Sequence, residues 1–311
     1  MRVAVLDVGS NTVNLLIVDA RQGSAPVPVH SERMDLRLAE HIDSDGRIAE
    51  AAVASLVKIV RQSGYLARKL KCQEFESFAT SAIRDAVNGS AVIKRVRQET
   101  GTKLEVMSGS EEAALTFLAV RRWYGWSSGR LLVADIGGGS VELSAGAGEF
   151  PDQAESVLLG AGRMYRRFFR HDPPKQGQVH ELREHVHTVL SPLVETFTDQ
   201  GADHIVGTSK TFRQLARLAY RDSSHAKDAD EDLLYADDLH RLADRLVKMD
   251  LGEREELPRI SAARAPQLAA GAVVASQIMR TLDLDCLEVC PWALREGVIL
   301  RRIDALRSKE N

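Results

Sequence analysis

Cysteine is scarce in this sequence. Among its 311 residues there are three, Cys72, Cys286 and Cys290, and they form neither a CxxC pair nor a zinc-binding spacing. An odd and sparse count of cysteines argues against a disulfide framework and is typical of a protein from a reducing compartment.

Net charge and long apolar runs are lacking too. The formal net charge is −3, so no basic field would attract nucleic acid or an anionic membrane. No stretch approaches the roughly 18 apolar residues of a membrane span. The chain begins almost directly with a predicted strand, which leaves no room for a signal peptide. We therefore expect a cytoplasmic protein without nucleic-acid or membrane partners, in which a local site attracts any anionic substrate.

What is present is a glycine-rich turn in two copies. The first reads DVGSNT at residues 7–12 and the second reads DIGGGS at residues 135–140, each between two apolar stretches. Asp135 stands 128 residues after Asp7, and Gly139 stands 128 residues after Asn11. Two such turns in register predict a duplicated domain with a ligand held between the copies.

The residue types of both turns suit a phosphate and a metal ion. Glycine lets the backbone approach a ligand closely, and successive N–H groups of such a turn form an anion site. Carboxylates at strand ends are ligands for Mg²⁺. The alternative is a pair of β-hairpins in which glycine serves the turn geometry alone, but a hairpin needs no aspartate at the end of its first strand. The candidate phosphate-binding residues are Ser10, Asn11, Gly137, Gly138, Gly139 and Ser140, and the candidate metal ligands are Asp135, Glu142 and Asp7.

The rest of the chain alternates predicted strands and helices, which is the pattern of a sheet covered by helices. Apolar residues at helical spacing predict a long helix whose buried stripe includes Val60 and Tyr65. Pro192 interrupts another predicted helix, and the polar stretch over 221–231 predicts a surface loop. The sequence thus indicates an α/β fold.

Six motifs resemble those of the exopolyphosphatase/guanosine pentaphosphate phosphohydrolase (Ppx/GppA) family. They occur in the family's order and span essentially the whole chain, so together they are specific although none is decisive alone. They read DVGSNT at 7–12, ATSAIRDAVN at 79–88, SGSEEA at 108–113, DIGGGSVE at 135–142, GTSKT at 207–211 and LREG at 294–297.

The resemblance implies a fold and a domain organisation. The family belongs to the actin, hexokinase and Hsp70 superfold, which implies two duplicated ribonuclease H-like α/β domains with an active-site cleft between them. Domain I would comprise residues 1–124, completed by a C-terminal helix over 292–311. Domain II would comprise residues 125–291. The chain lacks the extra domain of longer family members, so we expect the short, two-domain form.

The resemblance also implies a catalytic base. In the family the base is the glutamate directly before the small residue of the Glu-Glu-Ala triplet, which is Glu112 here. From the residues alone Glu111 is a contender, and the helix dipole would favour an acid at either position. The two glutamates cannot share one role, because they point about 100° apart on a helix.

The resemblance further implies an arginine in the site. The family pattern places an arginine of the ATSAIR run in the active-site cleft, which is Arg84 here, and a guanidinium there would bind phosphate. Taken alone, Arg84 next to Asp85 is more typical of a solvated ion pair.

Residues 207–211 lie between a predicted strand and a helix N-terminus, a natural position for an anion. Thr208, Ser209 and Lys210 are therefore further phosphate-binding candidates. The commoner family pattern has a glycine where this chain has Lys210. In kinases of the superfold that glycine admits the nucleotide, so a lysine here argues against nucleotide binding and favours an inorganic polyanion.

These features predict an exopolyphosphatase, which removes terminal phosphates from inorganic polyphosphate with Mg²⁺ and a water activated by Glu112. Mn²⁺ suits the same oxygen ligands. One alternative is a guanosine pentaphosphate 5′-phosphohydrolase, and another is a non-catalytic regulator that binds polyphosphate or guanosine polyphosphates. A sugar or acetate kinase is disfavoured by Lys210.

Two features are left open by the sequence. Arginines at positions 163, 166, 167 and 170 either line a groove for long polymers or form a solvated helix face. A homodimer is compatible with the sequence, which contains no signal that decides the oligomeric state.

Overall fold

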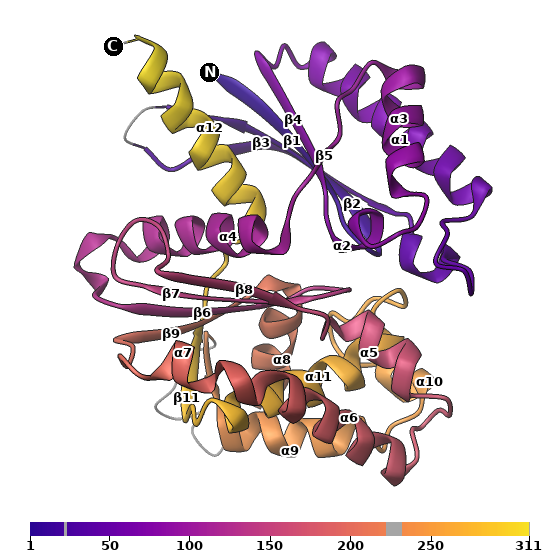
Figure 1. Ribbon diagram of the computed structural model, residues 1–311, viewed down its shortest axis with the longest axis vertical. Coiled ribbons are helices and arrows are strands. Elements are labelled where there is room, and N and C mark those ends of the chain that lie inside the picture. Colours follow the sequence, from indigo (N-terminus) through magenta and orange to yellow (C-terminus); the bar gives the residue numbers. More distant parts are fainter. Residues whose placement is uncertain (22–23, 222–231, 311) are drawn as a thin grey trace. The chain divides into compact units, whose positions relative to one another are not determined.

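Figure 1 shows the computed structural model of the chain, which describes residues 1–21, 24–221 and 232–310. The chain forms two compact units: unit 1 is Met1–Leu115 with Leu294–Asn311, and unit 2 is Thr116–Ala293. The boundary falls within helix α4 (Gly109–Tyr124), whereas the boundary expected from the sequence falls at the end of that helix. The domain assignment made from the sequence stays a prediction. The surface loop predicted over 221–231 lies outside the described residues from position 222 onward.

Unit 1 is built on a five-stranded sheet in the order β3-β2-β1-β4-β5. Within it α1 and α3 lie side by side, and α12 packs on β1 (Figure 1). The strands are β1 (Arg2–Val8), β2 (Thr12–Asp19), β3 (Val27–Asp35), β4 (Glu74–Ala79) and β5 (Glu105–Val106). The helices are η1 (Leu38–His41), α1 (Glu50–Lys69), α2 (Ser81–Arg84), α3 (Gly89–Thr100) and α12 (Leu294–Glu310), together with the start of α4.

Unit 2 is built on a six-stranded sheet in the order β10-β11-β9-β6-β7-β8. The strands are β6 (Leu131–Ile136), β7 (Val141–Gly146), β8 (Gln153–Val157), β9 (His204–Thr208), β10 (Leu233–Tyr235) and β11 (Cys286–Val289). The helices are η2 (Trp126–Ser128), α5 (Ala161–Phe168), α6 (Gln176–Leu190), η3 (Ser191–Leu193), α7 (Val194–Thr198), α8 (Ser209–Arg221), α9 (Ala236–Leu246), α10 (Leu251–Glu255) and α11 (Ala265–Thr281). Pro192 interrupts the helical segment as predicted, because α6 ends at Leu190 and the proline lies in η3.

The two sheets repeat one pairing scheme. In unit 1, β1 pairs antiparallel with β2 and parallel with β4, and in unit 2, β6 pairs antiparallel with β7 and parallel with β9. The register agrees residue for residue, since Asp7 lies opposite Asn14 and Asp135 lies opposite Glu142. β10 is an additional strand at one edge of unit 2. The duplicated α/β fold predicted from the two glycine turns is therefore confirmed.

The buried stripe of α1 differs in one residue from the prediction. Val60 is fully buried, but Tyr65 is 63% exposed. Tyr65 stands five positions after Val60, which is about 140° around the helix. The stripe passes through Ser63, Gly64 and Ala67 instead, so the prediction for Tyr65 was wrong.

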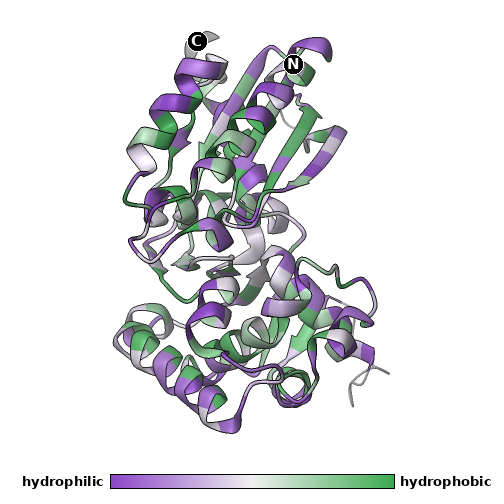
Figure 2. Ribbon diagram, turned by 90° about the vertical axis from the view of Figure 1, so that its right-hand side faces the viewer, coloured by the Kyte–Doolittle hydropathy of each residue, from purple (hydrophilic) through white to green (hydrophobic). Residues whose placement is uncertain are grey.

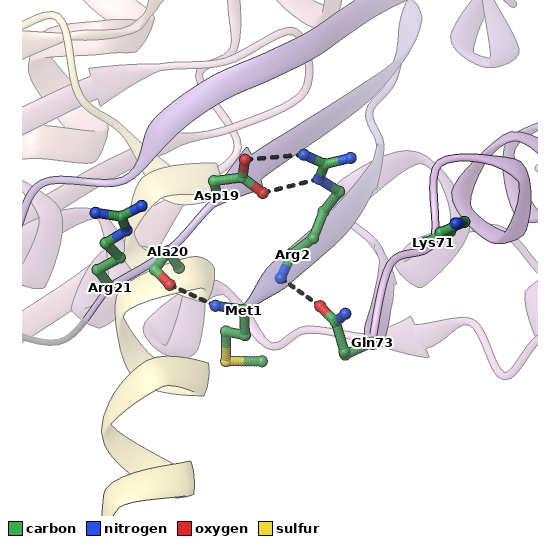
Figure 3. Close-up of a pocket in the computed structure, with 7 residues that line it drawn as sticks. All are labelled: Met1, Arg2, Asp19, Ala20, Arg21, Lys71 and Gln73. Atoms are coloured by element: carbon green, nitrogen blue, oxygen red, sulfur yellow. Dashed lines mark hydrogen bonds and ion pairs between the residues drawn. The ribbon is translucent and has the colours of Figure 1, made fainter.

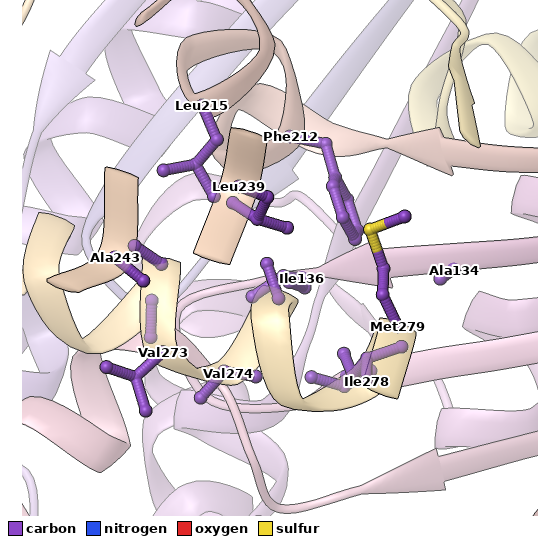
Figure 4. Close-up of a cluster of buried hydrophobic side chains, with 14 of the residues drawn as sticks. Ala134, Ile136, Phe212, Leu215, Leu239, Ala243, Val273, Val274, Ile278 and Met279 are labelled. Carbon is purple, nitrogen blue, oxygen red and sulfur yellow. The ribbon is translucent and has the colours of Figure 1, made fainter. Parts of the chain in front are cut away.

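Helix α11 forms the centre of the unit 2 core. A helix that is apolar all round belongs in a core, and α11 is buried along nearly its whole length. Figure 4 shows its Val273, Val274, Ile278 and Met279 beside Phe212 of α8 and Ile136 of β6. In Figure 2 most strands carry long green, apolar stretches, and many helices alternate between green and purple along their length. The core thereby fixes β6, which leads into the second glycine turn.

Polar contacts fix the start of β1, at the end of the strand opposite to Asp7. The Arg2 guanidinium donates two hydrogen bonds of 2.8 Å to the Asp19 carboxylate, and the backbone nitrogen of Met1 donates to the Ala20 carbonyl (Figure 3). A cavity of about 330 Å³ lies here. Within the described parts of the chain, no helix is both long enough and apolar enough to cross a membrane.

Candidate active site

The two glycine turns close in the same way. The Gly9 N–H donates to the Thr12 carbonyl at 3.0 Å, and the Gly137 N–H donates to the Ser140 carbonyl at 3.0 Å. A Cβ atom added to Gly9 would lie 3.2 Å from the Thr12 carbonyl oxygen, and one added to Gly137 would lie 3.3 Å from that of Ser140. Any side chain would therefore crowd the first position of either turn, which explains the glycine in both copies.

In the second turn, every glycine carbonyl is bound by the first turn of α5. The Gly137 carbonyl accepts from the Ala161 N–H at 3.0 Å, and the Gly138 carbonyl accepts from the Arg163 N–H at 3.0 Å. The Gly139 carbonyl accepts from Arg163 Nε at 2.8 Å. The three carbonyls therefore all point toward α5.

The direction of the carbonyls sets the direction of the N–H groups. Among the described peptide bonds only Asp172–Pro173 is cis, so the peptides of the turn are trans. In a trans peptide the N–H points opposite to the preceding carbonyl. The N–H groups of Gly138, Gly139 and Ser140 therefore point away from α5, and none donates to an acceptor in the described part of the chain. Three such N–H groups in succession form an anion-binding concavity.

The first turn is fastened by the segment that follows β3. The Ser10 carbonyl accepts from the Ala39 N–H at 3.0 Å, and the Asn11 carbonyl accepts from the Arg37 N–H at 2.8 Å. The side chain of Ser10 is buried and lies 3.1 Å, oxygen to oxygen, from the hydroxyl of Ser81, the first residue of α2. Ser10 and Asn11 are thus fixed in place at the end of β1.

Glu111 and Glu112 follow the start of α4 and have different surroundings. Ser108 and Glu111 form a capping box: the Ser108 N–H donates to the Glu111 carboxylate at 2.8 Å, and the Glu111 N–H donates to the Ser108 hydroxyl oxygen at 3.2 Å. The Ser108 hydroxyl also donates to the Glu111 carboxylate at 2.8 Å. The two bonds that the carboxylate accepts from Ser108, the one from the backbone first, lower the pKa of the Glu111 carboxyl from its ordinary value. Glu111 is therefore engaged at the helix end.

Glu112 instead points into unit 1 and meets Arg84. Its residue is 5% exposed, and its carboxylate forms an ion pair with Arg84 Nη1. The same nitrogen donates to the Met107 carbonyl at 3.0 Å, and Arg84 Nε lies 3.4 Å from the Asp85 carboxylate. The structure therefore brings together the two residues that the sequence suggested as catalytic. A largely buried carboxylate held in one orientation is suited to accept a proton from a nearby water.

Asp7 lies near the end of β1 in mixed electrostatic surroundings. Burial raises the pKa of its carboxyl to about 6, although the charge of Arg295 and a hydrogen bond from Asn14 oppose this rise. The charge of Glu296 adds to it. The LREG motif at the start of α12 thus lies close to Asp7, in the same unit as the first glycine turn.

Asp135 and Glu142 supply two carboxylates to the second turn. They are directly opposite on the antiparallel strands β6 and β7, so their side chains lie on one face. The Glu142 carboxylate accepts from the Ser156 hydroxyl at 2.9 Å. The described residues contain no group of three or more acidic, histidine or cysteine side chains that would enclose a metal. Two carboxylates fit Mg²⁺, which usually keeps several waters and completes its shell with substrate phosphates.

The third phosphate-binding segment is partly committed to internal contacts. Thr208 is fully buried, and its hydroxyl donates to the Trp292 carbonyl at 2.7 Å. The Ser209 hydroxyl oxygen accepts from the Thr211 N–H at 3.2 Å, and Ser209 has a positive φ of 76°. Lys210 lies in the first turn of α8, half-buried. The side chains of Thr208 and Ser209 are therefore both engaged in contacts within the protein.

The sequence did not single out three residues of the site, namely Ser81, Ser108 and Arg163. Ser81 belongs to one of the six motifs, and Arg163 is one of the four arginines over 163–170. The Ser108-x-x-Glu111 spacing is a capping-box signature that would have separated Glu111 from Glu112. The contacts of Ser81 and Arg163 join segments far apart in the chain, so no local pattern could have shown them.

Known proteins are similar to this chain over nearly its whole length. Residues 16–306 match the Ppx/GppA phosphatase family. Exopolyphosphatase 1 of Mycobacterium tuberculosis is 47% identical, over 98% of this chain and 89% of its own length. A guanosine-5′-triphosphate,3′-diphosphate pyrophosphatase of Vibrio parahaemolyticus is 27% identical, over 99% of this chain and 60% of its own length.

Solved structures of Ppx/GppA proteins superpose on this chain. The Ppx/GppA family member of Aquifex aeolicus superposes with a TM-score of 0.81 at 27% identity, covering 100% of this chain and 99% of its own. An exopolyphosphatase from Cytophaga hutchinsonii superposes with a TM-score of 0.87 at 26% identity, covering 98% of each chain. The motifs, the duplicated fold and these matches agree, and the chain belongs to the Ppx/GppA phosphatase family.

Proposed function

We propose that this protein is an exopolyphosphatase, which hydrolyses the terminal phosphoanhydride bond of inorganic polyphosphate and releases orthophosphate. The observation that carries this proposal is the row of three N–H groups in the second glycine turn, which face away from α5 without an acceptor in the described chain. The mycobacterial relative at 47% identity, named Exopolyphosphatase 1, supports the choice of substrate.

The proposed reaction assigns roles to both units. Glu112 accepts a proton from a water whose oxygen attacks the terminal phosphorus, and the bond from that phosphorus to the bridging oxygen breaks. The products are orthophosphate and a polyphosphate shortened by one unit. Arg84 orients the Glu112 carboxylate and adds positive charge beside it. The N–H groups of Gly138, Gly139 and Ser140 bind phosphate oxygens.

A divalent cation would be held by Asp135 and Glu142, with Mg²⁺ as the expected ion and Mn²⁺ accepted by the same oxygens. When bound, it neutralises negative charge on the phosphate oxygens. Asp7 stays a predicted ligand. The equivalent of Glu142 in the first turn is Asn14, an amide that donates to Asp7, so that turn offers one carboxylate where the second offers two.

A second candidate function is removal of the 5′-terminal phosphate of guanosine pentaphosphate. It is favoured by the Vibrio relatives, which match 99% of this chain. The same N–H groups and the same base would serve it. The half-buried lysine at position 210, at the N-terminus of α8, adds a positive charge suited to further phosphates of either substrate.

The test is phosphate release with Mg²⁺ from short polyphosphate, long polyphosphate, guanosine pentaphosphate and ATP, each at equal phosphate concentration. The proposal expects polyphosphate to be the best substrate. A preference for guanosine pentaphosphate would transfer the assignment to the second candidate. Binding of polyphosphate without release from any substrate would contradict a hydrolase and indicate a regulatory binding protein.

A further inference from the structure

The second glycine turn depends on one side chain for its shape. Two of its three carbonyls are bound by backbone N–H groups, those of Ala161 and Arg163, which any residue at these positions would supply. The third carbonyl, that of Gly139, is bound by Nε of the Arg163 side chain at 2.8 Å. The orientation of the Gly139–Ser140 peptide therefore depends on the identity of residue 163.

That peptide carries a group of the proposed phosphate site. Its carbonyl points toward α5, and its N–H, which belongs to Ser140, points to the opposite side. Gly139 has no Cβ atom to restrict rotation of the peptide, so a hydrogen bond is needed to select one orientation. If the peptide turned over, the Ser140 N–H would leave the anion site and a carbonyl oxygen would replace it.

The start of α5 lies in close contact with the same peptide. A Cβ atom on Gly160 would lie 2.4 Å from the nitrogens of Gly139 and Ser140. Glycine at 160 is thus required for α5 to approach closely enough for Arg163 to reach Gly139. In the first turn the equivalent carbonyl, that of Asn11, accepts instead from the backbone N–H groups of Leu36 and Arg37.

We infer that Arg163 is a positioning residue of the phosphate-binding turn, which holds the Gly139 carbonyl toward α5 and so aims the Ser140 N–H at a substrate phosphate. This inference rests on the proposed function, since it assumes that the turn binds phosphate. Arg163 fills this role through the hydrogen bond that its Nε donates, and not through its charge.

Three substitutions separate the donor from the charge. Glutamine places its side-chain nitrogen at the position of Nε and removes the charge. Methionine has a similar length with no donor, and lysine keeps the charge but has a carbon at the position of Nε. Arg97→Gln is the control, because Arg97 is an exposed arginine on α3 with no role in the proposed site.

The activity readout is kcat and KM for polyphosphate, together with the melting temperature. We expect Arg163→Met to lower kcat by about tenfold or more, Arg163→Gln to stay within about threefold of wild type, and Arg163→Lys to resemble Arg163→Met. Arg97→Gln should match wild type. If lysine preserves activity and glutamine does not, the charge is what matters and the inference is wrong. It is also wrong if all three variants match wild type, or if they lose melting temperature with unchanged kcat.

A second readout does not need catalysis. The amide ¹⁵N and ¹H shifts of Gly139 and Ser140 are followed while sodium tripolyphosphate is added to the full chain with Mg²⁺. Wild type and Arg163→Gln should respond alike, and Arg163→Met should show a weaker response at Ser140. No response in wild type would overturn the inference. A response in wild type without any phosphate release would leave it standing and refute the proposed hydrolase.

Discussion

At the scale of single residues, the site separates two neighbouring glutamates by their hydrogen bonds. Glu111 closes a capping box with Ser108, and Glu112 turns about 100° further round the helix to reach Arg84. The sequence resemblance pointed to Glu112, and the structure supplies a physical reason why Glu111 is occupied elsewhere. The family motif thus contains a structural acid and a candidate base side by side.

Because Glu111 is engaged in the capping box, we expect Glu111→Gln to lower the free energy of unfolding and to leave catalysis intact. The bonds from Ser108 lower the pKa of the Glu111 carboxyl below its ordinary 4.5, so its charge stabilises the fold above pH 4.5. That contribution is lost as the pH falls through the lowered pKa. We expect a loss of about 0.5 kcal/mol in the free energy of unfolding at pH 7, a small value because the group is exposed.

Urea unfolding of wild type and Glu111→Gln between pH 2.5 and pH 7 checks this. The difference between the two proteins should shrink toward zero at the acidic end. Glu255→Gln, an exposed glutamate on α10, is the control and should show no such trend. A Glu111 effect that grows as the pH falls would refute the role assigned here.

Some residue roles were beyond the reach of the sequence. Thr208 follows the pattern of a phosphate-binding turn, yet its hydroxyl is bound to the carbonyl of Trp292, a residue far along the chain. Nothing local to positions 207–211 signals that contact. Glycines and acids at strand ends were predictable because their constraints are local, whereas a partner for a buried hydroxyl is set by the tertiary fold.

At the scale of elements, the hairpins were predictable and their supports were not. Apolar stretches on both sides of a Gly-containing turn predict β1–β2 and β6–β7 directly, and the offset of 128 residues is visible in the sequence and in the strand register. The segments that fasten the turns, Leu36–Ala39 and the start of α5, follow a third strand in each unit. Their docking depends on strand pairing that no local pattern specifies.

Helix α12 packs closely against helix α4 at Gly297. A Cβ atom on Gly297 would lie 1.9 Å from the carbonyl oxygen of Leu115, so α12 packs on the backbone of α4 with no room for a methyl group. Gly297→Ala should therefore lower the free energy of unfolding by about 2 kcal/mol or more. The measurement is urea unfolding of the full chain.

Gly177→Ala is the matched control for that variant. Gly177 lies in the first turn of α6 with nothing within 4 Å of an added Cβ atom. Alanine there should raise stability by about 0.5 kcal/mol, because it restricts the unfolded chain and favours the helix. Equal effects of the two substitutions would contradict the close packing of α12.

At the scale of the whole molecule, duplication has been followed by divergence. Unit 1 carries the Glu112–Arg84 ion pair. Unit 2 carries the second glycine turn, whose N–H groups point away from α5, and the facing carboxylates of Asp135 and Glu142. The position opposite the aspartate is an asparagine in one copy and a glutamate in the other. The two hairpins thus share one pairing scheme but carry different side chains at this position.

The two carboxylates of unit 2 predict how the enzyme responds to metal removal. A chelator should abolish phosphate release without lowering the melting temperature, since two ligands do not hold the fold together. Asp135→Asn should raise the Mg²⁺ concentration needed for half-maximal activity by about tenfold or more. Glu155→Gln, an exposed acid on β8, should leave that concentration unchanged. The measurement is phosphate release across a Mg²⁺ titration, and equal curves for wild type and Asp135→Asn would exclude the site.

The most direct measurement is the rate of phosphate release from polyphosphate by wild type, Glu112→Gln and Glu111→Gln under one set of conditions. The account predicts that Glu112→Gln is slower by about 100-fold or more, because the proton acceptor is lost, and that Glu111→Gln is within a few-fold of wild type. Near-wild-type release by Glu112→Gln, or a larger loss in Glu111→Gln, would contradict it.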